Sequence, residues 1–158
     1  MKAVVNWQEE MKFTGTGPSG FTVQMDADSA LGGTGGGVRP MEMIALGLIA
    51  CQAMDVISIL QKKRQQVTKF EVRFDGPRSP EYPKVFTRAE ITFVVTGKQV
   101  SEDAMLRSIE LAATKYCPAS AMLEQAFPMD LQYEIYDEED GGDARLIHQG
   151  VWQTTTGE

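Results

Sequence analysis

Residues 40–61 read PMEMIALGLIACQAMDVISILQ, and this stretch decides the fold. Pro40 suits the first turn of a helix, because its missing N–H would have no partner there anyway. A helix that is apolar on nearly all sides must be buried on nearly all sides. Its longest uncharged apolar run, residues 43–51, is nine residues long, whereas a bilayer-spanning helix needs about 20. The stretch therefore predicts a central helix that the rest of a soluble domain surrounds.

The composition and charge indicate a cytoplasmic protein. A chain of 158 residues can bury a sizeable core within one domain. Residues 137–158 hold six acidic residues against Arg145 alone, and no basic patch elsewhere indicates nucleic-acid binding. The first residues lack the apolar core of a signal peptide. The two cysteines lie 66 residues apart and are expected to stay reduced in the cytoplasm. We expect no nucleic-acid or membrane partner.

Strand patterns flank the predicted helix. Alternation or short β-prone runs predict five strands, at residues 2–7, 11–16, 21–26, 67–75 and 85–96. The last two are long and are joined by a Pro-rich loop, so they form an antiparallel hairpin with one dry face and one wet face. Phe70, Val72 and Phe74 share the dry face, which covers the helix. The wet face holds Lys69, Glu71 and Arg73.

The remainder of the body is predicted to be helical and then to end in a strand. Ser101, followed by two acidic residues, starts a helix that runs to about residue 116. A shorter helix begins at Cys117-Pro118, and residues 129–136 alternate as a last strand. The fold class is therefore α+β, with antiparallel sheets around a long central helix in one domain, residues 1–137.

Residues 138–158 are predicted to be an acidic C-terminal tail. The segment is rich in acidic residues and glycine, which is typical of a loosely held terminus. Its apolar residues could dock on the body, although no strand or helix is predicted for them. We expect deletion of the tail to leave the fold intact. The apolar residues concerned are Leu146, Ile147, Val151 and Trp152.

Cys117 and Cys51 are the residues most suited to chemistry. Cys117 precedes a proline that opens a helix, so it is the predicted N-cap. The positive end of the helix dipole and nearby Lys115 would favour its thiolate, although an unreactive capping side chain fits the residues equally well. Cys51 lies in the middle of an apolar helix, where burial raises a thiol pKa and makes a structural role usual. Asp55, one turn later, would also disfavour a thiolate.

His148 is the single histidine, and it lies in the predicted tail. One histidine excludes a multi-histidine metal site and argues against a Cys–His or Ser–His–Asp catalytic arrangement. We therefore expect no metal and no cofactor.

Two sequence motifs resemble the OsmC/Ohr family, the osmotically induced and organic hydroperoxide resistance proteins. The first is Pro40-Met-Glu42, which runs nine residues along an apolar helix to Cys51. The second, Lys115-Tyr-Cys117-Pro-Ala-Ser120, opens a later helix. The resemblance covers the order of predicted elements over residues 1–137.

The resemblance implies an intertwined homodimer with thiol peroxidase chemistry at the subunit boundary. In this scheme Cys51 attacks an organic hydroperoxide and becomes a sulfenic acid, although the residues alone favour Cys117 as the more acidic thiol. Cys117 then closes a disulfide, and a dithiol reductant resets the pair. The expected function is defence against oxidative or osmotic stress. The alternative is a non-enzymatic, redox-responsive or small-ligand-binding dimer on the same scaffold.

Two positions depart from the peroxidases that the chain resembles. Those proteins carry a Glu directly after the proline, where this chain has Met41, and Glu42 follows one residue later. They also carry an Arg in the early strand region, whereas residues 10–26 hold Lys12 as their one cation. Arg39 is the nearest guanidinium in sequence. The expected catalytic residues are Cys51, Cys117, Glu42 and Arg39, with Lys12 as a second candidate cation.

Overall fold

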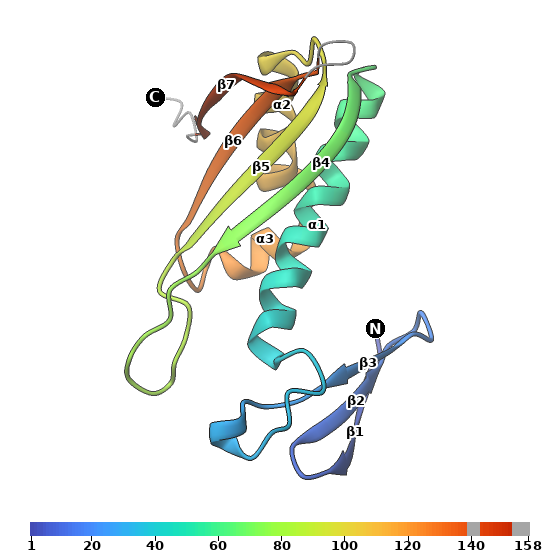
Figure 1. The fold of residues 1–158 in the computed structure, drawn as a ribbon, viewed down its shortest axis with the longest axis vertical. Helices are drawn as coiled ribbons and strands as arrows, with labels where there is room; N and C mark the ends of the chain where they lie inside the picture. The colour runs from blue at the N-terminus through green and yellow to red at the C-terminus, as the bar shows by residue number, and fades with distance from the viewer. Residues whose placement is uncertain (139–142, 153–158) are drawn as a thin grey trace. The chain divides into compact units, whose positions relative to one another are not determined.

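The structure, a computed structural model, describes residues 1–138 and 143–152 and divides into two compact units. The first unit is Met1–Leu46 and the second is Gly47–Glu158. The long helix α1 (Pro40–Lys62) begins in the first unit and continues in the second (Figure 1). The long helix predicted from residues 40–61 is therefore confirmed.

The first unit holds a three-stranded antiparallel sheet in the order β1-β2-β3. Its strands are β1 (Val4–Glu9), β2 (Lys12–Thr16) and β3 (Thr22–Met25), as the sequence predicts. Among residues 1–46, all of which the structure describes, no apolar side chain is buried. Several apolar side chains each expose more than half of their surface, among them Val5, Trp7 and Phe21. A small sheet without an apolar core is not stable alone, so these side chains require a covering surface.

Asp26 fixes the segment that leads into α1. Its carboxylate accepts backbone hydrogen bonds from Ala27, Thr34 and Gly36 and one from the Thr34 hydroxyl. These bonds, chiefly the one from Gly36, hold the pKa of the buried Asp26 carboxyl well below its ordinary range. The Gly-rich stretch before α1 is thus tied to the end of β3 by one carboxylate.

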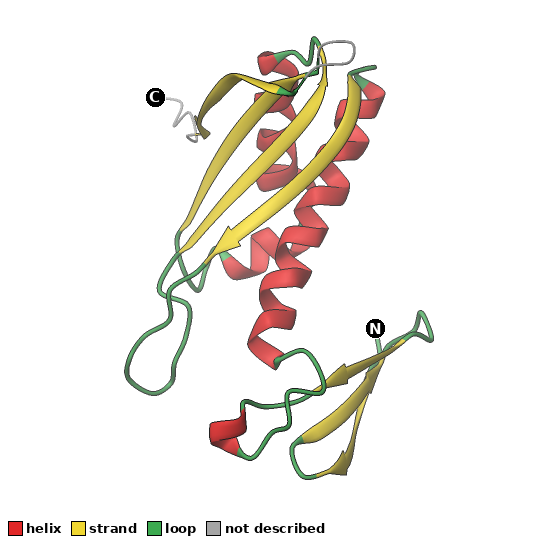
Figure 2. Ribbon diagram, in the orientation of Figure 1, coloured by secondary structure: helices red, strands yellow, loops and turns green. Residues whose placement is uncertain are grey.

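The second unit packs helices on one face of a four-stranded sheet (Figure 2). The strands, in sheet order, are β4 (Gln66–Asp75), β5 (Ala89–Lys98), β6 (Met129–Asp137) and β7 (Arg145–Trp152). The predicted hairpin β4–β5 is antiparallel. The β5–β6 pair is parallel, because helices α2 (Glu102–Leu111) and α3 (Pro118–Leu123) cross over between these two strands.

The register predicted for β4 is confirmed. Phe70, Val72 and Phe74 are half-buried, whereas the intervening charged residues are exposed. The neighbouring strand β5 lies deeper in the core, since its residues Ile91 and Val95 are fully buried. A slip of one residue would reverse every side chain of β4, so the apolar alternation fixes the pairing.

The prediction of a loosely held tail was wrong for residues 145–152. These residues form β7, which pairs antiparallel with β6 from Asp137↔Arg145 to Leu131↔Trp152. Trp152 is half-buried at the end of the strand. Residues 139–142 and 153–158 lie outside the described residues, and the domain boundary at residue 137 stays a prediction.

Helix α1 buries one stripe within the single chain rather than all of its sides. The buried positions are Leu48, Gln52, Val56, Ile59 and Leu60, whereas Met54 is 71% exposed. By length and composition α1 could span a membrane, a test that core helices of soluble proteins also pass. The cytoplasmic location stays a prediction.

Candidate dithiol site

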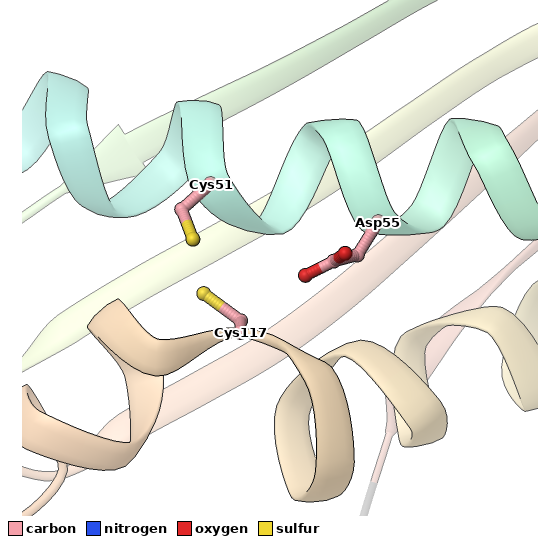
Figure 3. A group of neighbouring side chains, drawn as sticks. All are labelled: Cys51, Asp55 and Cys117. Atoms are coloured by element: carbon pink, nitrogen blue, oxygen red, sulfur yellow. The ribbon is translucent and has the colours of Figure 1, made fainter.

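Cys51 and Asp55 lie one turn apart on α1, so their side chains share a face of the helix. Both residues are half-buried, next to the buried stripe formed by Leu48, Gln52 and Val56. Figure 3 shows the two side chains pointing from α1 toward Cys117. An apolar helix thus presents a thiol and a carboxylate to the same neighbour.

Cys117 occupies the N-cap of α3, as the sequence predicts. The extended backbone of this residue follows from Pro118, which disfavours a helical conformation at the residue before it. Its N–H donates to the carbonyl of Ala112 at 3.0 Å, closing a π-helical turn, Ala112–Tyr116, after α2. Its Sγ accepts the Ser120 N–H at 3.4 Å. The turn and the cap together place a buried sulfur opposite α1.

The two sulfurs and the Asp55 carboxylate converge. Their ligand atoms all lie within 4.8 Å of one another, and both cysteines are free thiols. Two residues separated by 66 positions in the sequence therefore form one dithiol. The prediction that Cys51 and Cys117 come within reach of each other agrees with this geometry.

The surroundings of Cys51 disfavour its thiolate. Burial is the largest cause that raises the pKa of Cys51, and the hydrogen bond to the Cys117 sulfur raises it further. The backbone hydrogen bond from Ala119 acts in the opposite direction, while the charges of Cys117 and Asp55 add to the rise. Among the described residues of the second unit, none of the groups that shift the pKa of Cys51 is a cation. The sequence-based expectation of a raised pKa for Cys51 has the right direction.

A pocket of about 530 Å³ opens beside Cys117, and Cys51 is not among its lining residues. Gln52 borders it, is 1% exposed, and donates from Nε2 to the Ser120 hydroxyl at 2.8 Å. Its Oε1 is buried with no hydrogen-bond partner among the described residues. The bond between Gln52 and Ser120 joins residues 68 positions apart, so no local sequence signal predicts it. Among the other residues that line the pocket are Lys115, Cys117, Glu124, Leu131 and Trp152.

Arg39 and Glu42 form an ion pair in the first unit. Arg39 Nη1 lies 2.7 Å from Glu42 Oε1, and the Arg39 backbone N–H donates to Glu42 Oε2 at 2.9 Å. These bonds, the backbone one first, lower the pKa of Glu42. Arg39 also pairs with Asp28, and Lys12 pairs with Glu9 at 3.1 Å. Action of Arg39, Glu42 or Lys12 on the thiols of the second unit stays a prediction.

The fold and the site define an α+β protein with a dithiol between a long central helix and the cap of a later helix. The family model described as OsmC-like protein matches residues 33–132. The chain therefore belongs to the OsmC-like family, and the resemblance found in the sequence is confirmed.

Relatives with known sequences and structures agree with this assignment. Protein YhfA of Escherichia coli strain K12 is 38% identical over 135 residues, which cover 85% of this chain and 98% of YhfA. The crystal structure of a hypothetical protein from Aquifex aeolicus VF5 matches this fold with a TM-score of 0.77, over 87% of this chain and 97% of that one. The two sequences are 26% identical. An organic hydroperoxide resistance protein from Elizabethkingia anophelis is 15% identical, with a TM-score of 0.61 over 86% and 94%. At this low identity, the last comparison shows a shared fold and nothing more.

Proposed function

We propose that this protein is a thiol-dependent peroxidase that reduces organic hydroperoxides through Cys51 and Cys117. The observation that carries the proposal is the convergence of two free thiols from distant parts of the chain. Membership of the OsmC-like family supports it, as does the fold shared with a protein named for organic hydroperoxide resistance. The apolar residues of α1 around Cys51 favour an organic substrate over hydrogen peroxide.

The first step oxidises Cys51. Its thiolate attacks the terminal oxygen of the hydroperoxide, the O–O bond breaks, and an alkoxide leaves that takes up a proton to become the alcohol. Cys51 is then a sulfenic acid. The Ala119 N–H stabilises the attacking thiolate, because a backbone hydrogen bond to the charged form favours that form.

The second step closes a disulfide. The Cys117 sulfur attacks the sulfenic sulfur, and the sulfenic oxygen leaves as water. A dithiol reductant then returns both cysteines to thiols and becomes a disulfide itself. Adding cumene hydroperoxide to the reduced protein should therefore consume two thiols per chain, measured with a thiol reagent. Consumption of neither thiol at modest peroxide excess would exclude the peroxidase.

The rate of Cys51 oxidation should rise with pH. The thiolate is the reactive form, and the pKa of Cys51 is raised above its ordinary value of 9.0. At neutral pH the thiolate is therefore scarce, and its fraction grows about tenfold per pH unit until the pKa is reached. The initial rate, measured with the Cys117→Ser variant to isolate one thiol, should follow this slope. A rate that is constant above about pH 6 would show a thiolate already formed at neutral pH.

In the proposal, Arg39 of a second chain supplies the positive charge that the peroxidases of the family take from an early Arg, and Glu42 holds that guanidinium. Within one chain Arg39 precedes Cys51 by twelve residues, about 18 Å along α1, so it cannot reach the sulfur of its own chain. The roles rest on the family resemblance and on the ion pair between the two residues. Arg39→Gln should lower the rate of Cys51 oxidation at neutral pH about tenfold or more, because a half-buried thiolate in an apolar site is stabilised by a nearby cation. The pH profile should also move further to alkaline pH.

Arg73→Gln is the matched control for this variant. Arg73 is likewise exposed and likewise paired with a carboxylate, that of Glu71 at 2.5 Å, but it lies on the wet face of β4. Its loss should leave the oxidation rate unchanged. Equal effects of the two variants would remove Arg39 from the proposed site.

The homodimer is part of the proposal, because one chain leaves much apolar surface uncovered. Only 28% of the most apolar part of α1 is buried, and Trp7 of β1 is 65% exposed. Patches of this kind on a soluble protein mark an interaction surface. Sedimentation at micromolar concentration should give a dimer, and Trp7→Glu should shift it toward monomer. A folded wild-type monomer would contradict the intertwined arrangement.

A second candidate is a small-ligand-binding protein without turnover. The Oε1 of Gln52, which has no hydrogen-bond partner in the described part of the chain and lies beside the pocket next to Cys117, is the observation that favours it, because a buried acceptor gains from a ligand that donates. This reading replaces the peroxidase if peroxide leaves both thiols unchanged.

A further inference from the structure

Cys51, Asp55 and Cys117 present a donor set that peroxide chemistry does not fully use. The reaction needs the two sulfurs, yet the Asp55 carboxylate lies with them, all within 4.8 Å of one another (Figure 3). A carboxylate beside a reacting thiol is a hindrance, because its charge opposes formation of the thiolate. The position of Asp55 therefore calls for another explanation.

The three groups are ligands of the kind that bind thiophilic divalent metals. Zinc takes Cys sulfur at about 2.3 Å and carboxylate oxygen at about 2.0–2.2 Å, usually with tetrahedral geometry. Two sulfurs in such a site lie about 3.8 Å apart by this geometry. Because the donors already lie within 4.8 Å of one another, rotations of side chains suffice to bring them onto one ion.

The electrostatics of the site favour a cation. Two thiolates and a carboxylate would bring three negative charges together in a half-buried to buried place. The groups that act on Cys51 in the described part of the second unit include no positive charge. A divalent ion would neutralise two of the three charges, and metal binding deprotonates thiols that are otherwise hard to ionise.

We propose that Cys51, Asp55 and Cys117 bind one thiophilic divalent cation, of the Zn²⁺ class, when both cysteines are reduced. The three protein ligands leave a fourth position to water. Cys51 and Asp55 come from adjacent turns of α1, and Cys117 comes from the N-cap of α3, so the ion joins the two helices. The inference rests on the placement of these donors and does not depend on peroxidase activity.

The protons and charges of binding balance. Each thiol gives up its proton and becomes a thiolate ligand, while the Asp55 carboxylate coordinates without a proton change. Binding therefore releases up to two protons: the free site, with two thiols and one carboxylate, carries −1, and the loss of two protons offsets the two charges of the ion, so the bound site also carries −1. Affinity should fall in acid, where the protons compete with the metal. No redox change is involved.

Co²⁺ and Zn²⁺ are the probes that test the site. Co²⁺ added without oxygen to the fully reduced protein should give sulfur-to-metal charge-transfer bands and tetrahedral visible bands, saturating at one ion per chain. Zn²⁺ should displace it and raise the midpoint of thermal unfolding, because the ion binds the folded state. Absence of the charge-transfer bands in the folded, reduced wild type would overturn the proposal.

Single substitutions separate this site from adventitious binding. Cys51→Ser and Cys117→Ser should each lose the two-thiolate spectrum, and Asp55→Asn should weaken Zn²⁺ binding about tenfold. Asp75→Asn removes an exposed carboxylate at the end of β4 and serves as the matched control, with unchanged affinity. Circular dichroism confirms that each variant is folded. Equal Zn²⁺ affinity in wild type and Asp55→Asn would remove Asp55 from the site, and equal affinity in Cys51→Ser would overturn the proposal as a whole.

A failed peroxidase and a failed metal site give different results. If peroxide leaves the thiols intact while Co²⁺ gives the expected bands, the metal site stands alone. If peroxide consumes two thiols while Co²⁺ gives no bands, the dithiol is redox-active and binds no such metal. Where both hold, bound Zn²⁺ should slow the oxidation of the thiols by peroxide, because both sulfur lone pairs are engaged.

Discussion

Cys51→Ser is expected to abolish turnover of organic hydroperoxides, and Cys117→Ser is expected to stop after one equivalent. A serine hydroxyl at position 51 is not a nucleophile toward the O–O bond without strong activation, so the rate should fall more than about 100-fold. The Cys117→Ser variant still holds the attacking thiol but has no partner sulfur for the disulfide. Its product should be a sulfenic acid at Cys51.

The two variants are distinguished by the product as well as the rate. After one equivalent of cumene hydroperoxide, the wild type should show a mass loss of two hydrogens, from the disulfide. Cys117→Ser should instead gain one oxygen and react with a sulfenic-acid reagent at Cys51. If the labelled sulfenic acid is found at Cys117 in the Cys51→Ser variant, at the wild-type rate, the roles of the two cysteines are reversed.

Ala53→Ser is a suitable control for this pair of variants. It places a serine on α1 two residues after Cys51, at a half-buried position. A serine in a helix interior costs only a few tenths of a kcal/mol, about 0.5 at most. Turnover should therefore remain near that of the wild type. A comparable loss in Ala53→Ser would point to damage to the helix rather than to lost chemistry.

The local positions of both cysteines follow from the sequence, whereas their meeting does not. A cysteine before a proline that opens a helix is an N-cap by local sterics, and this was predictable for Cys117. Cys51 on the apolar helix is equally local. Their approach depends on the π-helical turn Ala112–Tyr116, which adds a wider turn at the end of α2 before the cap. Such turns have no clear sequence signal, so the family resemblance was needed to join the two residues.

The sequence pattern does not predict the strand β7, because pairing with a neighbouring strand decides the conformation of these residues. Residues 145–152 read RLIHQGVW, an imperfect alternation that includes a glycine and sits in an acidic segment. Strand preference depends strongly on the neighbouring strand, and here β6 offers a full edge. The glycine has a packing role, since a Cβ at Gly150 would lie 2.8 Å from the Tyr133 hydroxyl. That close approach is visible only once the two strands are paired.

The second large effect concerns this strand: ending the chain at Asp137 is expected to destabilise the second unit by about 3 kcal/mol or more. The truncation removes the β6–β7 ladder over seven residue pairs and the half-buried Trp152. It also removes His148, whose Nδ1 lies 3.4 Å from Glu102 of α2. Because domains are stable by only about 5–15 kcal/mol, the urea midpoint should fall markedly, and the bared edge of β6 should promote aggregation.

Substitutions within β7 separate the strand from the rest of the segment, because they keep every other residue. Gly150→Val should force Tyr133 aside, weaken its hydrogen bond to Glu102 and cost about 1–3 kcal/mol. Val151→Ser is the control, since Val151 is 55% exposed and its change should lie within about 0.5 kcal/mol. The urea midpoints of the truncated chain, Gly150→Val and Val151→Ser are each compared with that of the wild type. If the truncated chain and Gly150→Val both unfold at the wild-type midpoint, then β7 contributes nothing to stability, and the segment is dispensable as its composition alone suggests.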